Sequence, residues 1–286
     1  MTGRRAVIGL SLLCALLVCA FAAQSASAIK PIHSLNTTMV TCKKEATKTH
    51  EFADAHCDTK SIGSNTGEFK HEKVALGTTT KVSGTNASVT ESTKKSEPAV
   101  LKGTIGLAKV TIECLKVTNN GTTSTLTNIE PAERRHTVSG FAETEFSECN
   151  VKELAKCIVT EPIVSKANVT GVEGMEGPKG EKNAMGGLFV GSGAEERFAE
   201  VQFTDKGAEA CSLHTLKFPI KGSVVATNGP TTESAQEGKG TGATWVFTPK
   251  FKMQTLKLGP NAAEFSTIVT PSNSTSKTPL SMTTGT

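Results

Sequence analysis

Short stretches in which apolar and polar residues alternate recur along most of the chain and predict β-strands. The clearest is AKVTIEC (108–114), in which every second residue is apolar or Cys and the residues between are Lys, Thr and Glu. A period of two places the apolar side chains on one face of a strand, so one face is predicted to be buried and the other exposed. The same reasoning predicts further strands at residues 63–84, 122–129, 138–146, 158–169, 198–203, 212–226, 245–258 and 264–269.

A β-hairpin is predicted around Asn119, Asn120 and Gly121, which separate the strand at 108–114 from the one at 122–129. Asn-Gly is the strongest short-range signal for a type I′ turn, because that turn needs positive φ at both central residues. By contrast, the glycine-rich stretch from Gly171 to Gly193 predicts a flexible loop. Its four glycines at every third position are too few for a collagen triple helix.

The fold class predicted from these patterns is mostly β, a β-sandwich or barrel of antiparallel sheets braced by disulfides, with little helix. Threonine, a β-branched residue that suits half-exposed strands, makes up roughly a seventh of the chain. We expect four segments: a signal peptide (1–28), an N-terminal segment with Cys42 and Cys57 and short strands (29–98), a main β domain (99–270) and a disordered tail (271–286).

The N-terminus has the three parts of a secretory signal peptide. Arg4 and Arg5 precede an uncharged apolar stretch, residues 6–23, and the small residues Ala26-Ser27-Ala28 predict cleavage after Ala28. A membrane anchor is the alternative, because the apolar stretch approaches spanning length. After cleavage, the mature chain would carry a net charge of about +2 and no membrane span. A net charge so close to zero gives no electrostatic reason to expect a nucleic acid partner.

Six cysteines remain after residue 28, and an even number behind a signal peptide predicts disulfides. Six cysteines allow fifteen pairings, which the sequence cannot distinguish. Preferring pairs close in sequence gives Cys42–Cys57, Cys149–Cys157 and, by elimination, Cys114–Cys211. The alternative is a zinc site, since His50, His56 and His71 lie near Cys42 and Cys57; the absence of zinc-ligand spacing argues against it, and we expect no metal and no cofactor.

No motif for catalysis is present. GxSxG is absent, and neither His136 nor His214 has a hydrolase signature around it. The cluster Glu143, Glu145 and Glu148 could supply paired carboxylates for glycoside cleavage, but exposed strand faces explain it more simply. With one Trp and no Tyr, the chain also lacks most of the aromatic platforms on which sugar rings stack. We therefore predict no catalytic residues.

The chain resembles a loose group of uncharacterised, Thr- and Gly-rich secreted proteins of high-GC Gram-positive bacteria. The resemblance covers most of the mature chain and rests on strand patterns and cysteine positions, which have low specificity. It implies an exported β protein and carries over no activity, cofactor or catalytic residue. The residues that carry it are EFADAHC (51–57), GEFKHEK (67–73), VTIEC (110–114), EFSECNVKELAKCIVTEPI (145–163), VQFTDKGAEAC (201–211) and PIKGSVV (219–225).

Three functions are compatible with this sequence. The first is a secreted, non-catalytic structural or interaction protein with a partner in the cell wall or another extracellular component. The second is a carbohydrate or small-ligand binding module that uses the loops near Gly186–Gly193 and Trp245. The third is a secreted hydrolase, for which a pocket lined by His214 or by the cluster Glu143–Glu148 would be the sign.

Overall fold

The computed structural model describes residues 36–57, 59–63, 66–86, 97–130, 137–175, 184–228, 243–251 and 253–284. The predicted signal peptide (1–28) lies outside these residues. From Ile32 onward the chain belongs to one compact unit. The described residues form antiparallel strands and a single short 3-10 turn, η1 (Ala194–Glu196), which confirms the mostly β prediction. None of the helical segments among them is long and apolar enough to cross a membrane.

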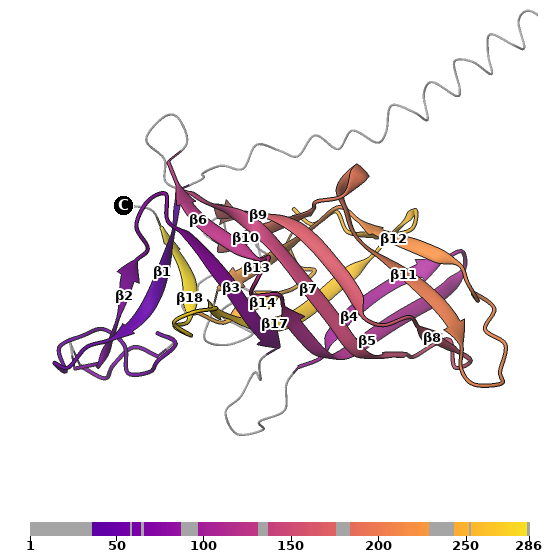
Figure 1. The fold of residues 1–286 in the computed structure, drawn as a ribbon, viewed down its shortest axis with the longest axis horizontal. Coiled ribbons are helices and arrows are strands. Elements are labelled where there is room, and N and C mark those ends of the chain that lie inside the picture. Colours follow the sequence, from indigo (N-terminus) through magenta and orange to yellow (C-terminus); the bar gives the residue numbers. More distant parts are fainter. Residues whose placement is uncertain are drawn as a thin grey trace, which may run out of the picture. The chain divides into compact units, whose positions relative to one another are not determined.

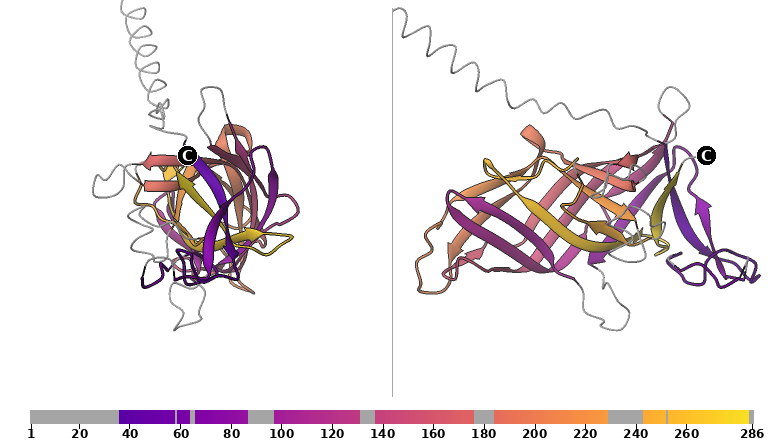
Figure 2. Two further views of the ribbon diagram at one scale, coloured as in Figure 1. Left: turned by 90° about the vertical axis from the view of Figure 1, so that its left-hand side faces the viewer. Right: turned by 180° about the vertical axis from the view of Figure 1, so that it is seen from behind.

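The centre of the fold is a closed antiparallel barrel (Figure 1), and the left view of Figure 2 looks roughly along its strands. Its strands are β3 (Thr79–Asn86), β4 (Ala99–Ile105), β5 (Ala108–Asn119), β6 (Thr125–Ile129), β7 (Thr137–Val151), β9 (Ile163–Met175), β10 (Ala184–Gly191), β13 (Ser223–Asn228), β14 (Trp245–Phe247) and β17 (Glu264–Asn273).

These ten strands occupy eight positions around the barrel, because two pairs of strands lie end to end. β3 and β4 both pair with β17, at residues 269–273 and 264–266 of that strand respectively. In the same way β5 and β6 pair with successive parts of β7. Taken in sequence order, each position then pairs with the next, and β17 closes the barrel on β3 and β4. The result is an up-and-down barrel, in which every connection joins neighbours.

The predicted hairpin at Asn120-Gly121 is wrong, because β5 and β6 do not pair with each other and instead run in one direction along β7. Asn120 holds the intervening residues as a small loop in this composite strand. Its backbone N–H donates to the Glu143 carbonyl of β7, and its side-chain Oδ1 accepts the N–H of Thr122 at 3.0 Å. The amide side chain therefore makes a local turn and the chain continues without reversing.

Two smaller sheets lie against opposite ends of the barrel strands, as the contacts of β1 with β6, β7 and β9 and those of β4 with β15 and β16 show. The first sheet has the order β18 (Leu280–Thr284), β1 (Thr37–Lys44), β2 (Phe69–Lys73). The second has the order β16 (Asn261–Ala262), β15 (Lys257–Leu258), β12 (Lys217–Lys221), β11 (Arg197–Asp205), β8 (Cys157–Val159).

Two buried asparagines attach the three-stranded sheet to the barrel. The Asn128 side chain of β6 accepts the Met39 N–H at 2.7 Å and donates to the Met39 carbonyl at 3.2 Å. The Asn228 side chain of β13 donates to the Met282 carbonyl at 2.8 Å. An asparagine side chain carries both a donor and an acceptor, so it can continue the backbone pairing where two sheets meet.

The predicted segment boundaries need correction at both ends of the main domain. β3 lies before residue 98 but belongs to the barrel, so the barrel begins inside the predicted N-terminal segment. The sequence predicts a disordered tail at 271–286, yet β17 continues to Asn273 and β18 pairs with β1. Leu280 and Met282 are fully buried there. These two apolar residues are enough to order an otherwise polar tail, because β1 supplies its pairing partner.

The predicted glycine-rich loop is also mostly strand, since β9 extends to Met175 and β10 begins at Ala184. Glycine is needed there because other backbone and side-chain atoms come very close. A Cβ at Gly186 would clash with the carbonyl of Ala226 on β13, and one at Gly171 would clash with the hydroxyl of Thr37. Glycine inside a strand often marks such a close approach.

All six cysteines after residue 28 form disulfides, and of the three predicted pairs only Cys42–Cys57 is confirmed. The other bonds are Cys114–Cys149 and Cys157–Cys211, so both remaining predictions are wrong. Cys114 and Cys149 lie directly opposite each other on β5 and β7, with 3.9 Å between their Cα atoms. Strand register, rather than distance along the chain, therefore selects the partner.

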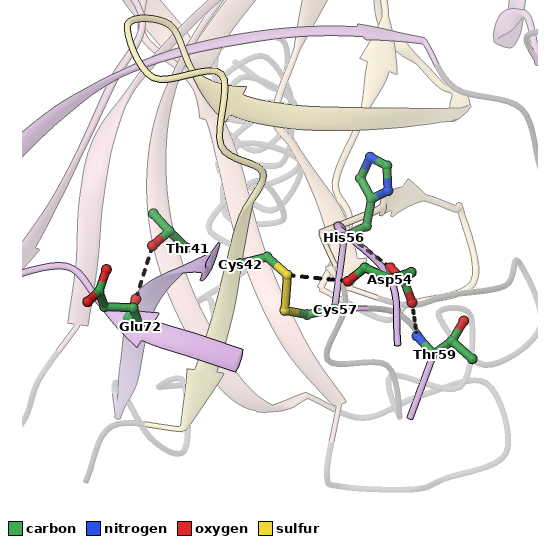
Figure 3. The surroundings of a disulfide bond; sticks show 7 residues. All are labelled: Thr41, Cys42, Asp54, His56, Cys57, Thr59 and Glu72. Carbon is green, nitrogen blue, oxygen red and sulfur yellow. Dashed lines mark hydrogen bonds between the residues drawn. A yellow bond between two sulfur atoms is a disulfide. The ribbon is translucent and has the colours of Figure 1, made fainter. Parts of the chain in front are cut away.

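The Cys42–Cys57 bond closes a loop that has little regular structure of its own (Figure 3). The Asp54 carboxylate of this loop accepts the backbone N–H groups of His56 and of Thr59, which follows the loop. The bond ties the loop to β1, because Cys42 belongs to that strand.

Non-reducing peptide mapping should recover one peptide pair containing Cys114 and Cys149 and another containing Cys157 and Cys211. Replacing both Cys114 and Cys149 by Ala is expected to lower the free energy of unfolding by about 4 kcal/mol, by the loop-entropy rule for a closed loop of 35 residues. Urea denaturation of this double variant measures the loss. A recovered Cys149–Cys157 peptide would contradict the pairing.

Candidate functional site

The interior of the barrel contains a cavity of about 130 Å³, counted as the space that the centres of water molecules can occupy. Alternation along the strands creates its wall. Over residues 163–169 of β9 every second residue faces the cavity and the residues between them are exposed. The cavity-facing residues of this strand are Ile163, Ser165, Ala167 and Val169.

Aromatic side chains form a continuous band along the cavity wall. The ring centroids of Phe189 and Phe247 are 5.0 Å apart, and those of Phe247 and Phe265 are 5.7 Å apart. Phe146 meets Phe265 edge-on at 5.9 Å, and Trp245 meets Phe189 edge-on at 5.9 Å. These rings come from β7, β10, β14 and β17, and they include the only tryptophan of the chain. They give the cavity a strongly apolar side.

Small side chains leave the space that these rings border. Ala142 of β7 and Ala167 of β9 are direct partners in the register, and both line the cavity. Gly84, Ala99 and Ala199 add further small positions to the lining. The interior of an eight-stranded barrel is just wide enough to be filled by side chains or to hold one small ligand. The alanines and the glycine make the second arrangement possible here.

Three residues that line the cavity also carry a buried polar atom without a hydrogen-bond partner: Trp245 Nε1, Thr267 Oγ1 and Asn119 Oδ1. In the described part of the chain five buried side-chain atoms are in this condition, and these three are among them. Trp245 and Thr267 are 5% and 4% exposed. Buried polar groups in proteins are almost always paired, so these three atoms are exceptions in the residues around the cavity.

The rest of the lining limits what the cavity can do. Among the described residues that line it there is no Asp, Glu, Lys, Arg or His. Hydroxyl groups of Ser124, Thr144 and Ser165 are present without a base beside them in this set. Such a wall can bind a neutral molecule, because an ion would lose its hydration without gaining a counter-charge. It contains no group suited to proton transfer at neutral pH.

The acidic cluster predicted as a possible carboxylate pair is not part of this cavity. Glu143 points outward, where its carboxylate accepts a hydrogen bond from Asn120 Nδ2 at 2.8 Å and lies 3.2 Å from Lys166 Nζ. These two contacts, the Asn120 bond first, lower the pKa of Glu143. Glu145 and Glu148 are exposed. A carboxyl group with a lowered pKa is poorly suited to act as a general acid.

The histidines singled out from the sequence lie apart from the cavity. Nδ1 of His214 lies 3.0 Å from the Asp205 carboxylate, and both side chains are well exposed. Asp205 also accepts the Cys211 N–H at 2.8 Å. Within the described ranges, no Ser or Thr hydroxyl lies within hydrogen-bond distance of His214 Nε2, as a triad would require. His136 lies outside the described residues.

The alternative zinc site loses two of its ligands, because Cys42 and Cys57 are bonded to each other. His71 packs against Phe52 with 4.6 Å between ring centroids, and burial lowers the pKa of this imidazole. No group of three or more possible metal ligands occurs in the residues that the structure describes.

The predicted ligand site near Gly186–Gly193 and Trp245 is placed differently by the structure. Residues 184–191 are strand β10 rather than a loop, and Phe189 of that strand lines the cavity next to Trp245. The sequence pointed to Trp245 and to the range 186–193, which contains Phe189, but missed Phe247, Phe265 and Thr267. Alternation identifies such residues as inward-facing, whereas only the closure of the sheet shows that they surround one space.

No protein-family model, no curated protein and no solved structure matches this chain.

Replacing Ala167 by Leu tests whether the interior has room. We expect the free energy of unfolding to rise by about 1 kcal/mol, as cavity-filling substitutions commonly achieve. In a fully packed interior the same change would cost about 1–3 kcal/mol. Urea denaturation shows whether the free energy of unfolding rises or falls. Asn168→Leu, at the next and exposed position, is the matched control and should change stability by less than about 0.5 kcal/mol.

Proposed function

We propose that this chain is an exported, non-catalytic binding protein that holds one compact apolar molecule inside its barrel. The observation that carries the proposal is the aromatic-lined cavity, whose lining residues include a few with hydroxyl groups. Mostly apolar concave sites with a few polar groups are the usual form of small-molecule sites.

The volume of the cavity limits the size of the ligand. An engineered protein cavity of about 150 Å³ lined by apolar side chains binds benzene. The cavity in this barrel is similar, at about 130 Å³. A single aromatic ring with a short substituent, or an alkyl chain of comparable volume, fits this limit.

The cavity favours this function over the others that the sequence left open. A carbohydrate would bring many hydroxyl groups to a wall that has few polar atoms, and those hydroxyls would lose their hydrogen bonds to water. A purely structural or interaction protein has no need for an interior cavity, and closure of the barrel leaves its ten strands without a free edge. A hydrolase needs a nucleophile with a base beside it, which the described lining lacks.

Export is supported by the three disulfides, since such bonds persist in oxidising compartments. The signal-peptide pattern with its expected cleavage after Ala28 supports the same location. A binding protein in this location would take up, store or carry its ligand outside the cytoplasm.

Tryptophan fluorescence offers a direct test, because Trp245 is the only tryptophan and the chain has no tyrosine. Titration with benzene, toluene, ethylbenzene and butylbenzene should shift the emission of Trp245. Affinity should increase by about fourfold for each added CH₂ group, in line with about 0.8 kcal/mol per buried CH₂. It should then stop increasing once the cavity is full.

Two variants make this titration specific to the cavity. In Ala167→Leu the affinity should stop increasing at a smaller ligand of the series, whereas Asn168→Leu should bind the series like the wild type. The proposal is contradicted if no member of the series changes the emission, or if both variants respond identically to all of them.

A further inference from the structure

We infer that the ligand of the barrel carries a single neutral hydroxyl or carbonyl group, which hydrogen-bonds to the side-chain hydroxyls of Thr144 and Ser165. This inference rests on the proposed function and adds a chemical class to it: a small alcohol or ketone rather than a hydrocarbon, a sugar or an ion. It follows from one level of the cavity wall, here called the polar row, which consists of Asn119, Thr144 and Ser165.

The strand register places the members of the polar row side by side. Asn119 of β5 lies directly opposite Thr144 of β7, and Thr144 lies directly opposite Ser165 of β9. Residues in such positions have Cβ atoms about 5 Å apart. Asn119 Nδ2 also donates a hydrogen bond to Thr144 Oγ1 at 3.4 Å, so these two side chains meet. The polar row therefore runs across three neighbouring strands.

The Ser165 side chain points into the cavity. Its neighbours Val164 and Lys166 are exposed, and Lys166 Nζ lies 3.2 Å from the outward-facing carboxylate of Glu143. Successive side chains of a strand point to opposite faces, so Ser165 faces inward, in agreement with its place in the cavity lining. A serine side chain consists of Cβ and a hydroxyl alone, so the hydroxyl is what this residue presents to the cavity.

The Ser165 hydroxyl is accessible and has no partner within the described residues. It makes no hydrogen bond there, and it is not one of the five buried atoms without a partner. Thr144 and Ser165 are both half-buried, whereas the next inward-facing residues, Ala142 and Ala167, are buried. The exposed part of an inward-facing side chain is turned toward the cavity, so a molecule in the cavity can reach this hydroxyl.

The levels on either side of the polar row are apolar, which limits the ligand to one polar group. Two residues from Thr144 and Ser165 in one direction, Ala142 is opposite Ala167. Two residues away in the other direction, Phe146 is opposite Ile163. All four of these residues line the cavity. A second polar group on the ligand would face this apolar wall and lose its hydrogen bonds to water without replacement.

The chemistry of the polar row specifies a neutral group. A serine or threonine hydroxyl carries one donor and two acceptor lone pairs, so it can pair with a hydroxyl or with a carbonyl oxygen. No charged side chain occurs in the described lining, so a carboxylate or an ammonium group would be buried there without a counter-charge. An apolar body with one hydroxyl or carbonyl group suits both the polar row and the apolar levels beside it.

Three ligands of nearly equal shape test this inference by isothermal titration calorimetry. Ethylbenzene, benzyl alcohol and benzylammonium differ in a terminal methyl, hydroxyl or ammonium group. The full mature wild-type protein should bind ethylbenzene and benzyl alcohol, and it should not measurably bind benzylammonium. In Ser165→Ala and in Thr144→Val, the affinity for benzyl alcohol relative to ethylbenzene should fall by about fivefold, the usual weight of one hydrogen bond.

Thr170→Val is the matched control, since Thr170 lies on the outward face of β9 and does not line the cavity. It should keep the wild-type ratio of the two affinities. The inference is overturned if Ser165→Ala or Thr144→Val keeps that ratio, if benzyl alcohol does not bind, or if benzylammonium binds as well as benzyl alcohol. Ethylbenzene binding would leave the proposed function intact in each of these cases. If the wild type binds none of the three, the proposed function fails and the inference with it.

Discussion

Closure of the sheet is the constraint on which the rest of this structure depends. β17 pairs with β3 and β4 and thereby joins the last strand of the barrel to the first. This pairing joins segments that are more than 150 residues apart in sequence, and it gives every barrel strand two neighbours. It also separates an inner face from an outer one. In each strand, one set of alternating residues therefore faces the interior and the other faces outward. Without closure, the band of aromatic rings would be the exposed face of an open sheet.

The three-stranded sheet and the Cys114–Cys149 disulfide are both joined to the barrel strands. Buried Asn128 and Asn228 connect the three-stranded sheet to the barrel strands. The bond between Cys114 and Cys149 joins β5 and β7 where alternation shifts, because the consecutive residues Leu115 and Lys116 are both exposed. The register of β5 and β7 is the same on both sides of this point, and the covalent link joins the two strands there.

The sequence predicted the strands well because alternation records a local property, namely which residues face inward. It predicted the connections poorly because they depend on partners far away in the chain. Asn120-Gly121 has the composition of a hairpin turn, yet β7 offers pairing to both flanking strands and keeps them in line. Cys149 is eight residues from Cys157, yet it lies directly opposite Cys114 on the neighbouring strand. The candidate site was recognisable only at Trp245 and in the range 186–193, which contains Phe189, since Thr267 is an ordinary strand residue until the barrel closes around it.

The central claim is that the closed barrel surrounds an accessible apolar space beside Trp245 and Thr267. A crystal structure determined under xenon pressure tests it most directly, because xenon enters dry apolar cavities and is located by its electron density. The account predicts a xenon atom inside the barrel, in contact with the rings of Phe189 and Phe247. An interior without xenon, with side chains filling the space that Ala142 and Ala167 border, would contradict it.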